Sequence, residues 1–226
     1  MSVSKGFFKK IQQWAVDKQS DSIAFLPFQG DGNPYKSKVF LVGTKPELEF
    51  HMDAGDIEIY ADSLVDSRLF HDVFHDEMSR EYIGSINFAK WVKEHLNESV
   101  TLSSINCYIS DPANLKQLKK SKDPLYIQGF EVFQQVLHEF EPYILILHGA
   151  STFKLFLNQF QHQLVDFKEQ DLKETVANLE QKGVIAKLPL NNGRYINVLV
   201  CRSMGYFGKE GNSFGHLKST LNMLLR

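Results

Sequence analysis

The sequence predicts an α/β protein, a three-layer α/β/α fold whose central, mostly parallel sheet has about four strands. Short apolar runs rich in β-branched residues alternate with segments of helical periodicity, as in chains of strand–helix units. Each run also ends in a loop with glycine or polar residues, which is typical of a parallel sheet with helices on both faces. The predicted strands are residues 39–42, 103–108, 143–147 and 196–200.

The composition is that of an ordinary globular protein. The 226 residues are 43% hydrophobic and 23% charged, and no Pro/Gly/Ser-rich linker divides them, so we expect a single domain over residues 1–226. The net charge of −2 lacks the overall basic character typical of nucleic-acid-binding proteins. A local basic face is still compatible with this charge. There is no signal-peptide pattern and no apolar run of about 18 residues, so we expect no membrane partner.

The cysteines and histidines give no metal site. Cys107 and Cys201 lie inside apolar runs, and two cysteines without a matching spacing predict reduced core residues in a cytoplasmic protein. We expect no cofactor and a monomer. Four possible ligands have helical spacing but no evident third partner, so a polar helix face is expected there: His71, Asp72, His75 and Asp76.

The first half of the chain leads into and out of the first strand. An amphipathic helix is predicted over residues 7–16, and turn-forming residues fill 27–37. The strand at 39–42 ends at Gly43, and Pro46 follows at once, which forces a sharp turn. Beyond it we expect a loop or irregular hairpin at 50–60, a helical segment at 66–82, and a short helix at 87–96.

The second half repeats strand and helix. A β-branched run at 100–109 ends at Asp-Pro, the most basic stretch follows at 115–124, and a helix is predicted at 127–140. The strand at 143–147 ends in His148-Gly149. The remaining elements are a helix at 151–160, a polar insertion at 164–179, a strand at 196–200, a Gly-rich loop at 202–215 and a helix at 217–225. Ligands should bind at the carboxyl edge, which loops 43–60, 106–112, 148–152 and 202–216 form.

These four loops, in this order, resemble the uracil-DNA glycosylase superfamily over most of the chain. Gly43-Thr44-Lys45-Pro46 resembles the family's Gly-x-x-Pro loop, where an acid or Asn positions the attacking water. Asn106 resembles the strand-end Asn that reads the pyrimidine edge. Three further segments resemble, in turn, the helix start after an apolar strand, the final loop and the closing helix: residues 145–150, 201–208 and 215–222.

The sequence departs from the family in two loops. Thr44 and Lys45 occupy the positions of the expected acid or Asn. The His of the family's His-Pro-Ser motif is replaced, and Arg202 is the residue nearest to its position. A lysine cation cannot accept a proton, so uracil excision should be weak or absent. If activity exists, it should need Glu47 or Asp53, and Lys45→Asp or Lys45→Asn should raise it.

The resemblance implies a set of site residues. Glu47 or Asp53 would activate water and Arg202 would stabilise the departing base or hold a phosphate. The expected substrate-binding residues are Gly43, Thr44, Lys45, Pro46, Phe50, Tyr60, Asn106, His148 and Ser203. Each has a plainer alternative: a strand-end Asn bonding its own backbone, core aromatics, solvated acids and Arg, and a structural His. Ser151 and Thr152 begin a helix whose N–H groups could be capped or bind phosphate.

Two functions follow from the resemblance. One is a divergent uracil-DNA glycosylase-like hydrolase that recognises a base in single-stranded or damaged DNA and excises it in DNA repair. The other is an inactive descendant that binds a nucleic acid or nucleotide, so whether the chain is an enzyme stays open. A different α/β hydrolase sharing only the fold is a third interpretation. Salt-sensitive DNA binding would use the 202–209 loop and Lys116, Lys119, Lys120 and Lys122, which otherwise form a solvated face.

Overall fold

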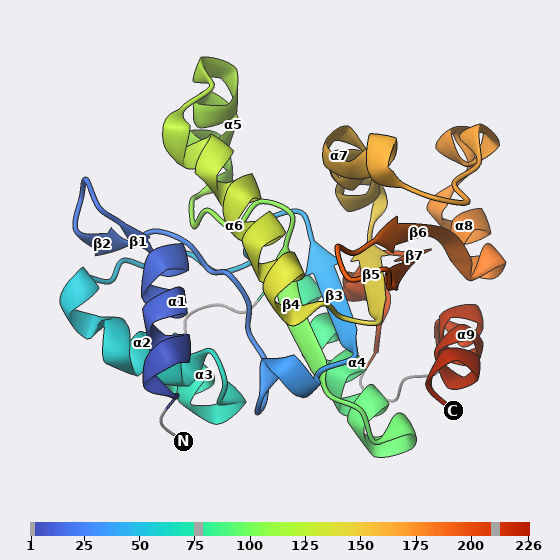
Figure 1. The fold of residues 1–226 in the computed structure, drawn as a ribbon, viewed down its shortest axis with the longest axis horizontal. Coiled ribbons are helices and arrows are strands. Elements are labelled where there is room, and N and C mark those ends of the chain that lie inside the picture. The colour runs from blue at the N-terminus through green and yellow to red at the C-terminus, as the bar shows by residue number, and fades with distance from the viewer. Residues whose placement is uncertain (1–2, 75–78, 209–212) are drawn as a thin grey trace.

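A five-stranded, mostly parallel sheet forms the centre of the protein (Figure 1). The computed structural model describes residues 3–74, 79–208 and 213–226. The strand order is β4-β3-β5-β7-β6, and only the β6–β7 pair is antiparallel. The strands are β3 (Val39–Gly43), β4 (Val100–Ser104), β5 (Ile144–His148), β6 (Val184–Pro189) and β7 (Tyr195–Cys201). A two-residue pair, β1 (Val16–Asp17) and β2 (Ser22–Ile23), lies outside this sheet. The predicted mixed α/β architecture with a mostly parallel sheet is confirmed.

The chain reverses direction across the sheet next to β3. It runs from β3 outward to β4 and then crosses back to β5 on the other side of β3. The carboxyl ends of β3 and β5 therefore flank a topological switch point, which is where open α/β sheets bind ligands. In Figure 1, α1 to α3 lie at the β4 end of the sheet, and α8 and α9 lie at the β6–β7 end.

Both faces of the central strands are buried, so β3 is apolar, and β5 is apolar up to its last residue, His148. Successive side chains point to opposite faces: Phe40 and Val42 of β3 join one hydrophobic core, and Val39 and Leu41 join a second. The helices are α1 (Lys5–Ala15), α2 (Ile57–Ser63), α3 (Ser67–Val73), α4 (Arg80–Leu96), α5 (Pro112–Ser121), α6 (Pro124–Phe140), α7 (Ala150–Phe160), α8 (Val176–Lys182) and α9 (Gly215–Leu225). Helices α1, α6 and α7 contribute to the first core, and α4 and α9 to the second.

Capping residues set where most helices begin. Asp111 and Asp123 each accept backbone N–H bonds ahead of a proline, at the starts of α5 and α6. Helix α7 differs because its N-cap is Gly149, which has no side chain to cap with and a φ of 88°. That positive φ suits glycine, and it leaves the first N–H groups of α7 without a side-chain acceptor.

Several predicted boundaries were wrong. The strand predicted at 103–108 ends at Ser104, because the Asn106 side chain accepts a bond from Tyr108 N at 3.0 Å and folds the backbone into a turn. Residues 50–60 contain helical turns, η2 (Ala54–Asp56) and the start of α2, rather than a hairpin. The segment at 87–96 belongs to the longer α4, and the polar insertion carries η4 (Glu169–Lys173) and α8. The edge strand β6 raises the strand count from four to five.

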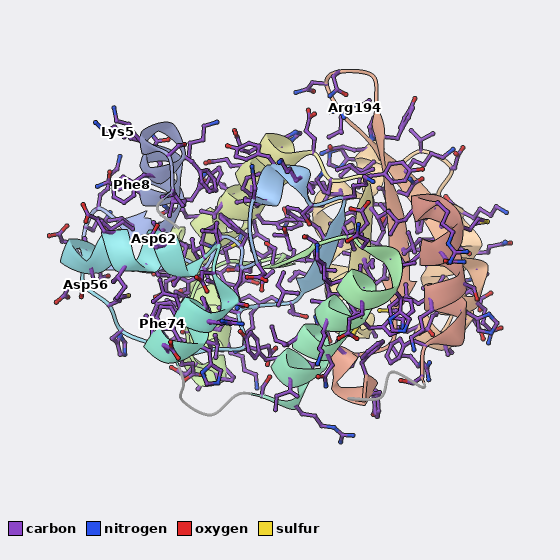
Figure 2. The ribbon with its side chains drawn as sticks, turned by 90° about the horizontal axis from the view of Figure 1, so that it is seen from below. Lys5, Phe8, Asp56, Asp62, Phe74 and Arg194 are labelled. Carbon is purple, nitrogen blue, oxygen red and sulfur yellow. The ribbon has the colours of Figure 1, made fainter. Side chains whose placement is uncertain are left out.

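An ion pair lies at the amino edge of the sheet, opposite the carboxyl edge. Glu141 precedes β5, and its carboxylate pairs with Arg194, which lies on the loop between β6 and β7 (Figure 2). Asn192 on the same loop donates to Glu141 at 2.7 Å. Two remaining short turns, η1 (Pro34–Lys36) and η3 (Gln161–Gln163), connect longer elements, and η5 (Met204–Tyr206) follows β7.

Candidate functional site

The loops after β3 and β5 meet at the switch point. A Cβ atom on Gly43 would lie 3.0 Å from Nε2 of His148, so glycine at this position lets the imidazole come close. The Thr44 and Thr152 hydroxyls lie 2.9 Å apart and join the loop to the first turn of α7. The Gly-x-x-Pro loop contributes to the walls of two cavities: Gly43, Lys45 and Pro46 line one, and Thr44 lines the other.

The first cavity, here called the Glu47 cleft, has a volume of about 50 Å³. Five residues of the predicted site line it: Gly43, Lys45, Pro46, Glu47 and His148. Other elements complete the wall with Leu26, Gln29, Leu41, Leu48, Tyr82, Ser85, Leu102, Ser103 and Ser104. Ligand pockets usually measure about 300–1,000 Å³, so the Glu47 cleft has room for water and not for a nucleobase.

Burial raises the pKa of Glu47, and the nearby Glu81 charge raises it further. The Ser79 hydroxyl and the Lys45 ammonium act in the opposite sense, because both favour the carboxylate. A carboxyl whose pKa is shifted up toward neutral pH is a better proton acceptor than a solvated one. Glu47 thus combines a cleft position with the kind of perturbed titration that marks functional carboxylates.

Glu81 connects the Glu47 cleft to the loop after β7. It lies in the first turn of α4, and its carboxylate accepts a hydrogen bond from the Ser203 hydroxyl. His148 is only 7% exposed, and among the described residues its Nδ1 has no hydrogen-bond partner. The Glu81 charge acts to raise the pKa of His148, but burial lowers it more. The lowered pKa favours a neutral imidazole. A neutral imidazole offers one donor and one acceptor.

The raised pKa of Glu47 predicts a pH-dependent stability difference. An unfolded glutamate ionises near pH 4.5, so the folded chain retains a proton above that pH and loses stability as the pH rises through the folded pKa. Glu47→Gln removes this loss. The melting temperature of the variant minus that of the unmodified protein should therefore rise from pH 4.5 upward and then level off, as thermal unfolding monitored by circular dichroism would show. A constant difference, or one that falls with pH, would exclude a raised pKa.

The second cavity, here called the basic pocket, has a volume of about 350 Å³. Thr44 of the 43–47 loop lines it together with residues of α5, α6 and α7. Three lysines line it, and none forms an ion pair with any carboxylate in the described parts of the chain. Its lining residues are Thr44, Asn106, Leu115, Lys116, Lys119, Tyr126, Ser151, Lys154, Leu155 and Asn158.

Asn106 lies in the wall of the basic pocket but is largely engaged. It is 1% exposed, donates from Nδ2 to Tyr126 O at 2.9 Å and accepts at Oδ1 from Tyr108 N. A Cβ atom on Gly129 would lie 2.0 Å from Oδ1, so α6 packs directly on the amide. One Nδ2 hydrogen remains for a ligand, because the amide nitrogen carries two. The backbone bond the sequence offered as an alternative is thus present.

Five other predicted site residues line neither cavity, and one of them, Ser203, donates its hydroxyl to Glu81. Arg202 binds the buried Glu180 through Nε and Nη2, each at 3.1 Å, and stacks over Phe214. Asp53 is exposed and Phe50 stacks on Phe74. Tyr60 is 0% exposed and donates its hydroxyl to Phe25 O at 2.7 Å. The surroundings of Asp53, Phe50 and Tyr60 fit their plainer interpretations, a solvated acid and two core aromatics, whereas Arg202 is paired with Glu180 instead of being solvated.

Sequence reasoning missed three lining or contacting residues. Glu81 lies in a helix whose start was not recognised, and Tyr126 lies before the predicted start of α6. Lys154 could have been found, because it is in the second turn of the helix that begins after His148-Gly149. Of the predicted lysines, Lys116 and Lys119 reach the basic pocket; Lys120 and Lys122 do not line it. His75, Asp76 and the last residue of the 202–209 loop, residue 209, lie outside the described residues.

No protein-family model matches the chain, and no curated protein matches it. Within the described ranges, the structure contains no helix that is both long and apolar enough to cross a membrane.

Proposed function

We propose that this protein is a divergent, uracil-DNA glycosylase-like hydrolase that recognises a base in DNA and cleaves its N-glycosidic bond. The observation that carries the proposal is the position of Glu47. This partly buried carboxylate, with a raised pKa, shares a cleft with His148 at the switch point, and the same loop also lines a pocket whose three lysines pair with no carboxylate that the structure describes. A three-layer α/β/α arrangement of the uracil-DNA glycosylase type is the fold that we propose with it.

Glu47 is the proton acceptor in this proposal. The oxygen of a water in the Glu47 cleft attacks C1′ of the sugar, the C1′–N bond breaks, and its electron pair leaves with the base. The water proton passes to Glu47. Lys45 lines the same cleft, and its positive charge partly opposes the rise in the pKa of Glu47 that burial and Glu81 cause. His148 and Lys45 lie at the carboxyl edge of the sheet. There they supply N–H donors that stabilise the negative charge developing on the departing base.

A second candidate function is binding without catalysis. Two observations favour it: the Glu47 cleft of about 50 Å³ is too small for a base as it stands, and most of the Asn106 amide is used internally. In this case the chain would hold DNA or a nucleotide through the basic pocket, and Glu47 would carry no reaction. The two candidates share the DNA partner and differ in whether a base is released.

Base release and DNA binding should be measured on the same oligonucleotides. Single-stranded and mismatched strands carrying uracil, hypoxanthine or xanthine are incubated with the purified protein, and free base is quantified by mass spectrometry. We expect slow release, since Lys45 occupies the place of the family's acid, and fluorescence anisotropy should show binding that weakens as salt rises. Salt-sensitive binding with no release supports the second candidate. Neither binding nor release from any strand would contradict both.

A further inference from the structure

We propose that the basic pocket binds the phosphomonoester of a nucleotide, taken either from a free nucleoside monophosphate or from the phosphorylated end of a strand. This goes beyond the proposed hydrolase and deepens the second candidate function, on which it rests, because it names the chemical group that the basic pocket holds whether or not the Glu47 cleft is catalytic. The pocket is built by residues from five separate segments: the 43–47 loop, the loop between β4 and α5, α5, the start of α6 and α7.

The charge of the basic pocket fits a phosphomonoester. Lys116 and Lys119 of α5 and Lys154 of α7 line one cavity, and no acidic side chain lines it. The whole chain has a net charge of −2, so three lysines around one cavity, without an ion-pair partner among the described residues, are a local excess. A phosphomonoester carries about −1.5 to −2 charges at pH 7, against about −1 for each backbone phosphate of a strand. Three lysines therefore match a monoester better than a single diester.

The start of α7 adds donors to the same cavity. Ser151 lines the basic pocket from the first turn of this 11-residue helix. Because the N-cap is Gly149, no side chain caps the free N–H groups there. Uncapped N–H groups together with the positive end of the helix dipole favour an anion. The helix end and the lysines come from different elements and act on the same cavity.

The size and remaining walls fit a nucleoside. A volume of about 350 Å³ lies in the range that encloses a small ligand. Tyr126 and Leu155 supply apolar surface, and Tyr126 is half-buried with its ring against Phe130. Thr44 and Asn158 supply hydroxyl and amide groups, and Asn106 retains one amide hydrogen. A phosphate on the lysines with a base or sugar against Tyr126 uses both kinds of surface.

Calorimetric titration of the full chain tests the assignment. The probes are thymidine 5′-monophosphate, thymidine, inorganic phosphate, and one oligonucleotide with and without a 5′-phosphate. We expect the monophosphate to bind and thymidine to bind at least about 10-fold more weakly, since charge-assisted bonds to the phosphate are lost. A preference for the phosphorylated over the unphosphorylated strand identifies a strand end as the source, and its absence identifies the free nucleotide.

Matched variants separate this pocket from general basic charge. Lys116→Ala combined with Lys154→Ala should weaken monophosphate binding by about 10-fold or more, whereas Lys120→Ala combined with Lys122→Ala removes the same charge and should leave binding unchanged. All four side chains are exposed, so the variants should fold. Equal losses in the two double variants, or equal affinity for thymidine and its monophosphate, would overturn the proposal. Glu47→Gln should bind the monophosphate as tightly as the unmodified protein. The binding result can therefore be interpreted even if the hydrolase proposal fails.

Discussion

Base release should fall by about 10²- to 10⁴-fold when Glu47 is replaced by Gln, the loss expected for a general base. The substitution keeps the size of the side chain and removes its ability to accept a proton. The same variant should be at least as stable as the unmodified protein near neutral pH, because burial and Glu81 both oppose ionisation of Glu47. Single-turnover release of free base from the best oligonucleotide, read by mass spectrometry, measures the effect.

Asp53→Asn is the matched control. Asp53 was the second candidate for the carboxylate, but it is exposed and lines neither cavity. Its substitution should leave base release unchanged. If Asp53→Asn greatly reduced base release and Glu47→Gln did not, the reacting carboxylate would lie outside the Glu47 cleft. That result would contradict the site described above.

Gly84→Ala should destabilise the fold by about 3 kcal/mol, at the upper end of the usual cost of overpacking. A Cβ atom at this position would lie 1.8 Å from the carbonyl oxygen of Met204, so either α4 or η5 must move. The obstacle is backbone, which yields less readily than the end of a flexible side chain. The free energy of unfolding from urea titration gives the loss, because it compares the two chains at equilibrium.

The displacement should also reach the candidate site. Glu81 lies in the same helix, and it accepts a bond from Ser203, which directly precedes η5. Gly6→Ala serves as the control, because a Cβ atom there meets nothing within 4 Å, and alanine favours a helix. If Gly84→Ala unfolds at the same urea concentration as Gly6→Ala, the close packing of α4 on η5 is wrong.

The sequence was most informative where burial is uniform. Strands β3 and β5 are buried on both faces, so their continuous apolar runs identified them and their ends. Because parallel strands end at one edge, those ends also predicted that Gly43 and His148 would lie in one site, and both line the Glu47 cleft. The same logic places Glu47 beside His148 in one cleft.

The rest depends on contacts between distant residues. The strand at 103–108 had the right β-branched content, but the Asn106 side chain competed successfully for the backbone at Tyr108. Arg202 was expected in the site, yet Glu180, which is 4% exposed and 22 residues earlier, binds it by two side-chain bonds. Nothing local to Arg202 indicates that partner. Likewise, Lys154 lines one cavity with Lys116 and Lys119 because the fold brings residues of α5 and α7, which are far apart in the sequence, to the same pocket.

The pH dependence of base release tests the central claim, that Glu47 in its cleft is the general base, most directly. A base with a raised pKa must lose its proton before it can act, so the single-turnover rate should rise as the pH increases above 4.5 and reach a plateau. Glu47→Gln should abolish that rise and leave a slow residual rate. A rate that does not change with pH, or an unchanged profile in Glu47→Gln, would contradict the assignment.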